Sequence, residues 1–379
     1  MVWRAHQDGM IALPFIHLDS PREIVRQFTP NWFAASMGTG IVALVLAQTP
    51  LKLAGQGLWL ANIALFTLFA GLYAARWILF PHGARRIFDH PVMSMFLGCA
   101  PMALATIVNG FLVFGPDLIG HKAIEIAAVL WRIDVALSVG CGLLVPFLMF
   151  TRHDHGIDRM TAVWLLPIVP AEVAAASGGL LIPHLTDPAL KLEVLVSSYA
   201  LWALSAPLAL GVLVILVLRM ALHKLPEAGM AATSWLALGP LATGALGLLL
   251  LGEAAPDALS GTGLGAYAAA FRGASLLGAL LMWGYGLWWL ATATLATLRQ
   301  IKLGLPFNLG WWAYIFPLGA FTLATLRLAG ILPIPSLLTF GHGLAAALTG
   351  AWLIVAARTL QGAWSGALFH APCLKEARA

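Results

Sequence analysis

Ten long apolar segments occupy most of this 379-residue chain, and they decide what it can fold into. Hydrophobic residues make up 60% of the sequence and charged residues 10%, against roughly 25% charged residues in a typical soluble domain. Each segment reaches the roughly 20 apolar residues that a spanning helix needs. Because the segments are continuous rather than short and alternating, a transmembrane β-barrel is excluded. The sequence therefore predicts an all-α polytopic membrane protein with spans at roughly 31–49, 57–79, 92–115, 124–150, 161–182, 195–219, 234–252, 266–297, 309–328 and 337–358.

Basic residues alternate between the connections of these segments. Fourteen of the 21 lysines and arginines lie in the chain ends and in every second connection, whereas the other five connections together hold four. Cytoplasmic connections of membrane proteins carry the excess of Lys and Arg. We therefore predict a multi-pass protein of the bacterial inner membrane with both termini cytoplasmic. Residues 1–30 and 361–379 are expected to flank a transmembrane domain of residues 31–360.

Few residues suggest catalysis or metal binding. The cysteines Cys99, Cys141 and Cys373 have no spacing typical of a metal site or a disulfide framework. Residues 153–155 (HDH) have no further ligand at fixed spacing, so a solvated loop explains them better than a metal site. A nucleotide-binding glycine-rich loop and a nucleophile elbow are also missing. We expect no cofactor, no metal, no enzymatic activity and, despite a net charge of +5, no nucleic-acid partner.

Helix-weakening residues recur in the odd-numbered segments. The first contains the cluster Ser36, Gly38, Thr39 and Gly40, which we take as candidates for lining a pore. Glycine removes side-chain bulk where an anion could contact backbone amides, although close helix packing explains the same glycines equally well. Two even-numbered segments also contain a proline, so the pattern is imperfect. It still suggests five related hairpins. The third, fifth, seventh and ninth segments contain Pro101, Pro167 with Pro170, Pro240 and Pro317, respectively.

The ninth segment has a phenylalanine directly before its proline. A proline inside a helix removes one hydrogen bond and clashes with the preceding turn, so Pro317 predicts a bend. A large aromatic ring beside a bend could plug a narrow pathway, which makes Phe316 a candidate gate. An aromatic residue packed between helices is the alternative. Phe307 and Phe321 lie close enough in the sequence to hold the same role.

Glu172 is an acidic residue near the middle of the fifth segment. Intramembrane carboxylates are costly and are functional candidates by default. Three roles are open for it: a proton-coupling group, a hydrogen-bond donor to a carbonyl freed by Pro167 or Pro170, and part of a pore wall. Thr243 in the seventh segment is a further pore-lining candidate, as are the prolines Pro101, Pro170 and Pro240.

Other polar residues inside the segments have two interpretations. Arg132, Arg272 and Arg327 belong toward the outer side in the predicted topology, where cations would attract anions or pair with acids. Arg327 is the anion-attracting candidate, because it ends a predicted pore helix. Single polar groups among apolar neighbours are expected to form interhelical hydrogen bonds. These groups are Asn62, Asn109 (also a pore-lining candidate) and His342.

Five blocks of the sequence are similar to one transporter family. They resemble, in the same order along the chain, blocks of the tellurite-resistance/dicarboxylate transporter family. This family includes bacterial tellurite-resistance proteins, fungal malate and sulfite transporters and plant slow anion channels. The resemblance extends over about residues 30–360. The blocks are NWFAASMGTGIVALVL (31–46), MSMFLGCAPMALATIVNG (93–110), WLLPIVPAEVAAASGG (164–179), SWLALGPLATGALGLLLLG (234–252) and FNLGWWAYIFPLGAF (307–321).

This resemblance implies ten helices in five hairpins, arranged with quasi-fivefold symmetry around a central pore that the odd-numbered helices line. It also implies a homotrimer in which each chain has its own pore. Family members close the pore with a phenylalanine of the ninth helix, and the matching residue here is Phe316.

The expected function is transmembrane transport of small anions, by a gated pore or a proton-linked secondary transporter. Four-carbon dicarboxylates such as malate are the first choice of substrate. Efflux of sulfite or another small inorganic anion is the alternative, followed by tellurite resistance. A membrane-embedded enzyme or a structural subunit would instead need catalytic groups gathered at one depth, whereas the polar residues here are scattered along the segments.

Overall fold

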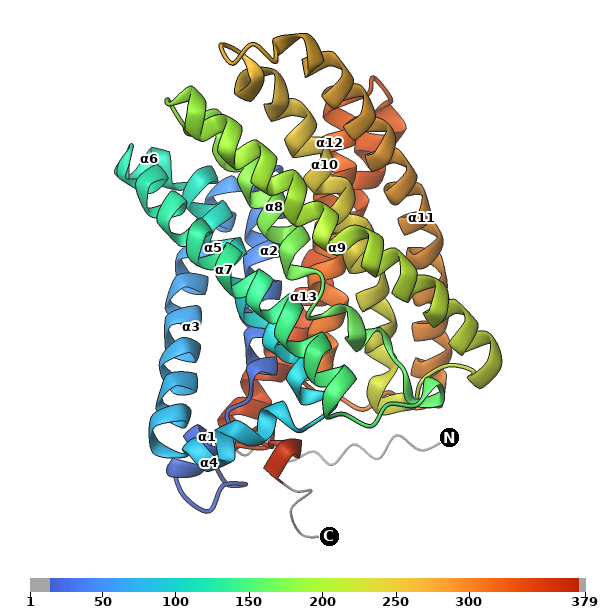
Figure 1. Ribbon diagram of the computed structural model, residues 1–379. Helices are drawn as coiled ribbons and strands as arrows, with labels where there is room; N and C mark the ends of the chain where they lie inside the picture. Colours follow the sequence, from blue (N-terminus) through green and yellow to red (C-terminus); the bar gives the residue numbers. More distant parts are fainter. Residues whose placement is uncertain (1–13, 375–379) are drawn as a thin grey trace.

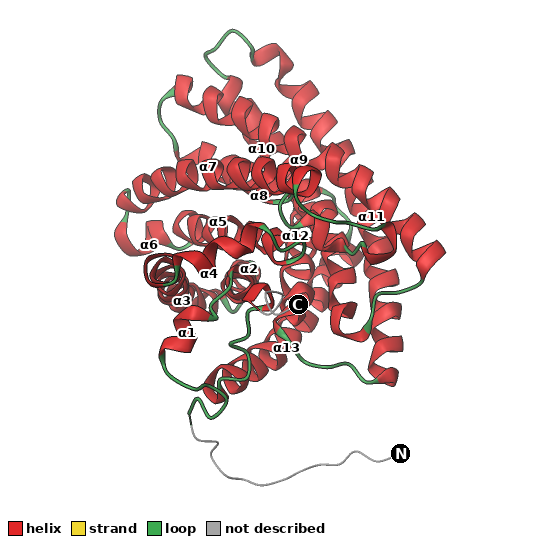
Figure 2. Cartoon of the chain, turned by 60° about the horizontal axis from the view of Figure 1, so that its bottom comes forward, coloured by secondary structure: helices red, strands yellow, loops and turns green. Residues whose placement is uncertain are grey.

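Helices make up all the regular structure in the described part of the chain, residues 14–374 of a computed structural model (Figures 1 and 2). Nine helical segments in this part are long and apolar enough to cross a membrane, which confirms the predicted all-α polytopic fold. Three of the basic residues of the chain ends that predict the orientation, Arg4, Lys375 and Arg378, lie outside the described residues. The nine segments contain α2 (Phe33–Ala47), α3 (Lys52–Leu79), α5 (Cys99–Val113), α7 (Lys122–Thr151), α9 (Pro188–His223), α10 (Leu238–Leu259), α11 (Ala268–Leu303), α12 (Ile315–Ile331) and α13 (Pro335–Ser365); three shorter helices are α1 (Arg22–Arg26), α4 (Pro81–Arg85) and α6 (Gly115–Ile119).

The predicted span at 161–182 is not one continuous helix. Its α-helical part is α8 (Pro170–Leu181), whose 12 residues extend about 18 Å, less than a bilayer core of about 30 Å. A 3-10 turn, η5 (Ala162–Leu165), precedes it. Pro167 and Pro170 lack backbone N–H groups, so a regular α-helix begins only at Pro170, where a missing N–H costs nothing.

The helices form two layers, an inner ring and an outer ring. In the most apolar stretch of the segment containing α10, 89% of the residues are buried, against 17% in the stretch from α3. The inner layer consists of α2, α5, α8, α10 and α12, and each of these contacts the next, with α12 returning to α2. The outer layer consists of α3, α7, α9, α11 and α13, which leave large apolar side chains exposed as a lipid-facing surface requires. The inner helices are the odd-numbered segments of the sequence.

Each inner helix begins with a 3-10 stretch rather than with a regular α-helical turn. The predicted bend in the middle of a helix at Pro317 is therefore wrong. Pro317 is the third residue of α12 and lies just after the point where η9 (Leu309–Tyr314) passes into the α-helix. A proline in the first turn of an α-helix sacrifices no hydrogen bond, since the first four N–H groups have no partner within the helix. Pro101 and Pro240 are likewise the third residues of α5 and α10. The remaining 3-10 stretches before inner helices are η1 (Pro30–Trp32), η3 (Met93–Gly98), η5 and η7 (Ala228–Ala237).

One tryptophan on each outer helix joins it to the inner helix of the next hairpin. Its indole N–H donates either to a backbone carbonyl or to a threonine hydroxyl of that inner helix. The five bonds together follow the whole ring, from α3 to α5, α7 to α8, α9 to α10, α11 to α12 and α13 to α2. They are Trp59 to the Ile107 carbonyl (3.3 Å), Trp131 to the Ala174 carbonyl (2.9 Å), Trp202 to the Gly244 carbonyl (3.1 Å), Trp283 to the Thr325 hydroxyl (2.9 Å) and Trp352 to the Thr39 hydroxyl (3.2 Å).

The two described ends of the chain meet at one end of the bundle. Arg76, near the end of α3, is buried, and its guanidinium donates to the Phe28 carbonyl at 2.6 Å and reaches the Cys373 thiol at 3.5 Å. The backbone N–H of Ala371 also donates to the side-chain oxygen of Gln27 at 2.8 Å. The buried arginine therefore ties the first and last described segments to the same helix.

Trp131→Phe should lower the free energy of unfolding by about 1–2 kcal/mol, because the buried Ala174 carbonyl loses its donor. Trp288→Phe is the matched control, since Trp288 lies on the exposed face of outer helix α11. Thermal unfolding of both purified variants in one detergent measures the difference. Equal shifts in the two variants would contradict a stabilising role for the indole bond.

Candidate anion pathway

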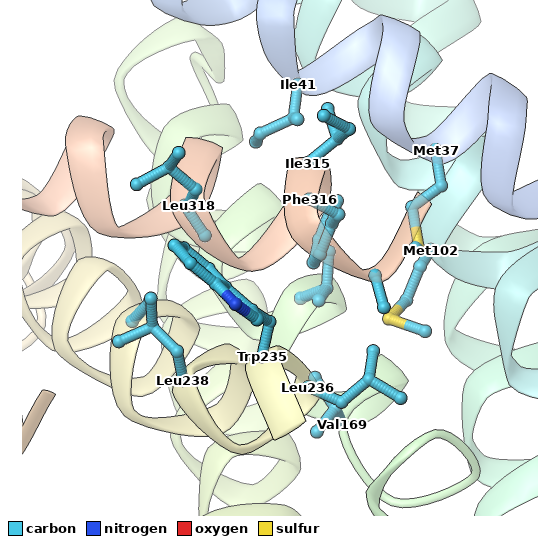
Figure 3. Packing of buried hydrophobic residues seen from close by; sticks show 14 of the residues in the cluster. Met37, Ile41, Met102, Val169, Trp235, Leu236, Leu238, Ile315, Phe316 and Leu318 are labelled. Atoms are coloured by element: carbon cyan, nitrogen blue, oxygen red, sulfur yellow. The ribbon is translucent and has the colours of Figure 1, made fainter. Parts of the chain in front are cut away.

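The five inner segments meet around an apolar cavity, here called the chamber, that contains Phe316. Only 3% of the Phe316 surface is exposed. Its ring lies beside Met37 and Met102, and above Leu236 and Val169 (Figure 3). The chamber is small, with a cavity volume of about 20 Å³, and its lining side chains are all apolar. Leu165, Leu166, Gly239 and Pro317 complete its lining, so every inner segment contributes.

A second cavity, here called the vestibule, is lined by residues further along the same five inner segments. Its cavity volume is about 80 Å³. Arg327 is its one charged lining residue, and Gln48 and Asn109 bring amide groups. Each inner helix contributes two residues four apart. These pairs are Leu44 and Gln48, Asn109 and Val113, Ala176 and Leu180, Leu246 and Leu250, and Leu323 and Arg327.

The chamber and the vestibule lie on the same face of each inner helix. Leu323 follows Phe316 by seven residues and Arg327 follows Leu323 by four, which is about two turns and then one turn of α-helix. The same spacing recurs on the other four inner segments, so all five present one stripe to the space between them. Along each helix the two cavities are about 10–16 Å apart. The other stripes are Met37, Leu44 and Gln48; Met102, Asn109 and Val113; Val169, Ala176 and Leu180; and Gly239, Leu246 and Leu250.

Glu172 and Thr243 lie together between α8 and α10. The Thr243 hydroxyl lies 3.0 Å from Oε2 of Glu172 and 2.9 Å from the Gly239 carbonyl, either of which can accept its proton. Both side chains are buried, and Oε1 of Glu172 has no hydrogen-bond partner among the described residues. Neither residue lines the chamber or the vestibule. The structure thus brings these two predicted site residues together, as a link between inner helices.

Most of the chain matches one protein family, since residues 27–360 fit the SLAC1 family, described as voltage-dependent anion channels. The chain belongs to this family. A sulfite efflux pump of Trichophyton rubrum is 36% identical over 353 residues, which cover 91% of this chain and 93% of the pump. An uncharacterized transporter of Methanocaldococcus jannaschii is 32% identical, covering 93% of this chain and 98% of the transporter. A malic acid transport protein of Schizosaccharomyces pombe is 24% identical, covering 87% of this chain and 77% of the relative.

These relatives confirm the family resemblance that the five sequence blocks predicted. Anion transport across a membrane is common to the family description, the sulfite efflux pump and the malic acid transport protein. The chain is therefore a multi-pass membrane protein of an anion-transporting family.

The glycine cluster of the first inner helix packs against neighbouring helices in this SLAC1-family protein. A Cβ atom added at Gly38 would lie 2.6 Å from the Trp312 ring, and one added at Gly40 would overlap the Thr106 side chain. Thr39 accepts the indole bond described above. None of these residues lines the chamber or the vestibule, so close helix packing accounts for both glycines.

The amide side chains have different environments. Asn62 of α3 donates to the Thr106 hydroxyl of α5 at 3.3 Å, which confirms the predicted interhelical bond. Asn109 instead lines the vestibule, and its Oδ1 has no partner among the described residues. His342 lies on the exposed face of α13.

The three arginines predicted near the outer side also differ. Arg327 pairs with Glu253 of α10, whose Oε2 lies 2.7 Å from Nε. Arg132 and Arg272 are exposed on α7 and α11, and neither forms an ion pair within residues 14–374. His153 contacts the Phe88 carbonyl at 2.8 Å, and the described part of the chain holds no group of three side chains suited to a metal ion.

Sequence reasoning missed a buried carboxyl group on an outer helix. Asp134 of α7 is fully buried, and neither of its oxygens has a partner among the described residues. The hydroxyl of Ser138, one turn further along, is also buried and has no partner within residues 14–374, and the same holds for the hydroxyl of Ser36 on α2. An acidic residue inside an apolar segment was the available signal for Asp134.

Gly40→Ala should lower the free energy of unfolding by about 1–3 kcal/mol, because the new methyl group overlaps Thr106 in a tightly packed interface. Gly57→Ala is the matched control, since a methyl group at Gly57 on α3 meets no atom within 4 Å. Denaturation in detergent compares the two. A Gly40→Ala protein as stable as the control, but with altered flux, would favour backbone contact with an anion instead.

Proposed function

We propose that this protein moves small anions along the axis between its five inner helices, which form a quasi-fivefold pore. The supporting observation is the repeated stripe, which puts an apolar chamber and a partly polar vestibule on one path. An ion inside a membrane protein needs a protein-lined route, because exposure to hydrocarbon is too costly.

Phe316 is the proposed gate of this pore. An apolar constriction blocks ions by excluding the water that hydrates them, and the chamber offers no polar side chain in exchange. Met37 and Met102 beside the ring have unbranched side chains with several rotatable bonds, so a change in their rotamers would make room for the ring to move. The other two candidates face elsewhere: Phe321 stacks on Trp283 of outer helix α11 and Phe307 packs on Trp311.

Ten crossings with both termini cytoplasmic complete the proposed topology in a bacterial inner membrane. The nine long segments and the segment that contains α8 together make ten crossings. An even number of crossings returns the chain to the side where it began, and the two described ends do meet at one end of the bundle. Basic residues of α4 and of the connection after α7 lie near that same end, where Arg152 pairs with Asp89. A homotrimer, which the family resemblance implies, is proposed as the assembled form.

Sulfite is the substrate that the comparisons favour. The sulfite efflux pump is 36% identical to this chain and the malic acid transport protein 24%. This reverses the order expected from the sequence, where dicarboxylates came first. Four-carbon dicarboxylates stay as the second candidate, because the Leu-rich wall of the vestibule would accept a carbon skeleton.

Phe316→Ala should raise anion flux at least about tenfold, because removing the ring lets water enter the chamber. Chloride and sulfite efflux from proteoliposomes measures it. Phe340→Ala, on the exposed face of α13, is the control and should leave flux unchanged. A well-folded Phe316→Ala protein with wild-type flux would contradict the gate.

Proteoliposomes loaded with sulfite, malate, chloride or nitrate, with and without an imposed pH gradient, should show sulfite moving faster than malate. Protein-free liposomes under the same gradient provide the background. Faster movement of malate would restore the dicarboxylate assignment. Flux of none of the four anions, even through Phe316→Ala, would contradict the proposed function as a whole.

A further inference from the structure

The vestibule has one polar side and one apolar side. Its polar groups are Arg327, Gln48 and Asn109, which come from α12, α2 and α5. These three helices are consecutive in the inner ring, because α12 contacts α2 and α2 contacts α5. The opposite side, from α8 and α10, is purely hydrocarbon. Low-dielectric walls of this kind concentrate the field of the single cation.

The guanidinium of Arg327 is held by one carboxylate oxygen. Both Nε and Nη2 contact Oε2 of Glu253, so Nη1 is not used by this pair. The side chains are 44% and 26% exposed, respectively, so water and solutes reach the pair. A neighbouring anion is what can offset the field of this guanidinium.

The nearby acid on α10 has a different partner. Asp257, one turn beyond Glu253, is held by Lys191 of α9 through both of its oxygens, at 2.8 and 2.7 Å. Glu253 is therefore the carboxylate that acts on Arg327. Asp257 supplies the same charge on the same helix without touching the vestibule arginine.

We propose that Glu253 sets the strength with which the vestibule attracts anions, by neutralising and holding Arg327. This inference rests on the proposed anion transport. A free arginine in a cavity walled by hydrocarbon would bind an anion well but release it slowly, and conduction requires binding weak enough for exit. The carboxylate of Glu253 competes with the passing anion for the guanidinium, so the vestibule binds anions with low affinity. The side-chain amides of Gln48 and Asn109 supply further hydrogen-bond donors to the anion.

Charge-changing variants at this pair test the inference. At low ionic strength and subsaturating sulfite or chloride on the vestibule side, Glu253→Gln should raise the initial influx rate about three- to tenfold, and Arg327→Gln should lower it by a similar factor. The double variant should match Arg327→Gln, because Glu253 acts through the arginine. Inert salt of about 0.5 M should remove most of the difference by screening.

Asp257→Asn is the matched control and should leave the rate unchanged. An equal increase in Asp257→Asn and Glu253→Gln would assign the effect to net charge and overturn the inference. An unchanged rate in Glu253→Gln would also overturn it. Glu253→Ala is the second variant if the Gln protein does not give a single symmetrical peak in size-exclusion chromatography.

The same experiment separates this inference from the proposed function. Anion flux in the wild-type protein with no response to Glu253 or Arg327 variants overturns the role of the pair alone. Absence of flux in the wild-type protein and in Phe316→Ala overturns anion transport itself.

Discussion

Five indole hydrogen bonds close the inner ring, and the proposed anion pathway depends on that closure. Lipid tails are as apolar as leucine, so helices in a membrane associate through packing and hydrogen bonds rather than through hydrophobic exclusion. Each bond here runs from the outer helix of one hairpin to the inner helix of the next, so the hairpins form a cycle. Two of the indoles that reach backbone carbonyls lie close to a glycine of the inner helix. A Cβ atom added at Gly110 would overlap the Trp59 indole, and one added at Gly178 would lie 3.1 Å from the Trp131 ring.

Closure of the ring gives the inner helices a common orientation. Once each is held by its neighbour's outer helix, residues seven and eleven positions apart point into the same central space. The chamber then collects the side chains at the 3-10 junctions, which are all apolar, and the vestibule collects those at the far ends. Arg327 in the vestibule and Phe316 in the chamber lie on the same face of α12.

Much of the fold could be predicted because membrane insertion constrains sequence directly. Segment length predicted the helices, and the prolines of the odd-numbered segments suggested their grouping into hairpins. The family resemblance, not these patterns, implied that the odd-numbered helices form the inner layer. The role of Pro317 was predicted incorrectly, because a proline in an apolar run looks the same whether it bends a helix or begins one. The 3-10 stretch of η9 decides this, and no residue pattern recognised in the sequence marks it. Gly38 and Gly40 were ambiguous for a similar reason, since only the positions of Trp312 and Thr106 show what each glycine faces.

The sequence alone determined that this chain is a helical membrane protein of an anion-transporting family, because hydropathy and family motifs are properties of residues in order. Tertiary structure decided which residues share a space. Glu172 and Thr243 meet across α8 and α10, and Arg327 pairs with Glu253 on another helix. Asp134 is buried with no partner in the part of the chain that the structure describes. These relations join residues about 70 positions apart or depend on helix rotation. They follow from how the ring closes, which local sequence does not encode.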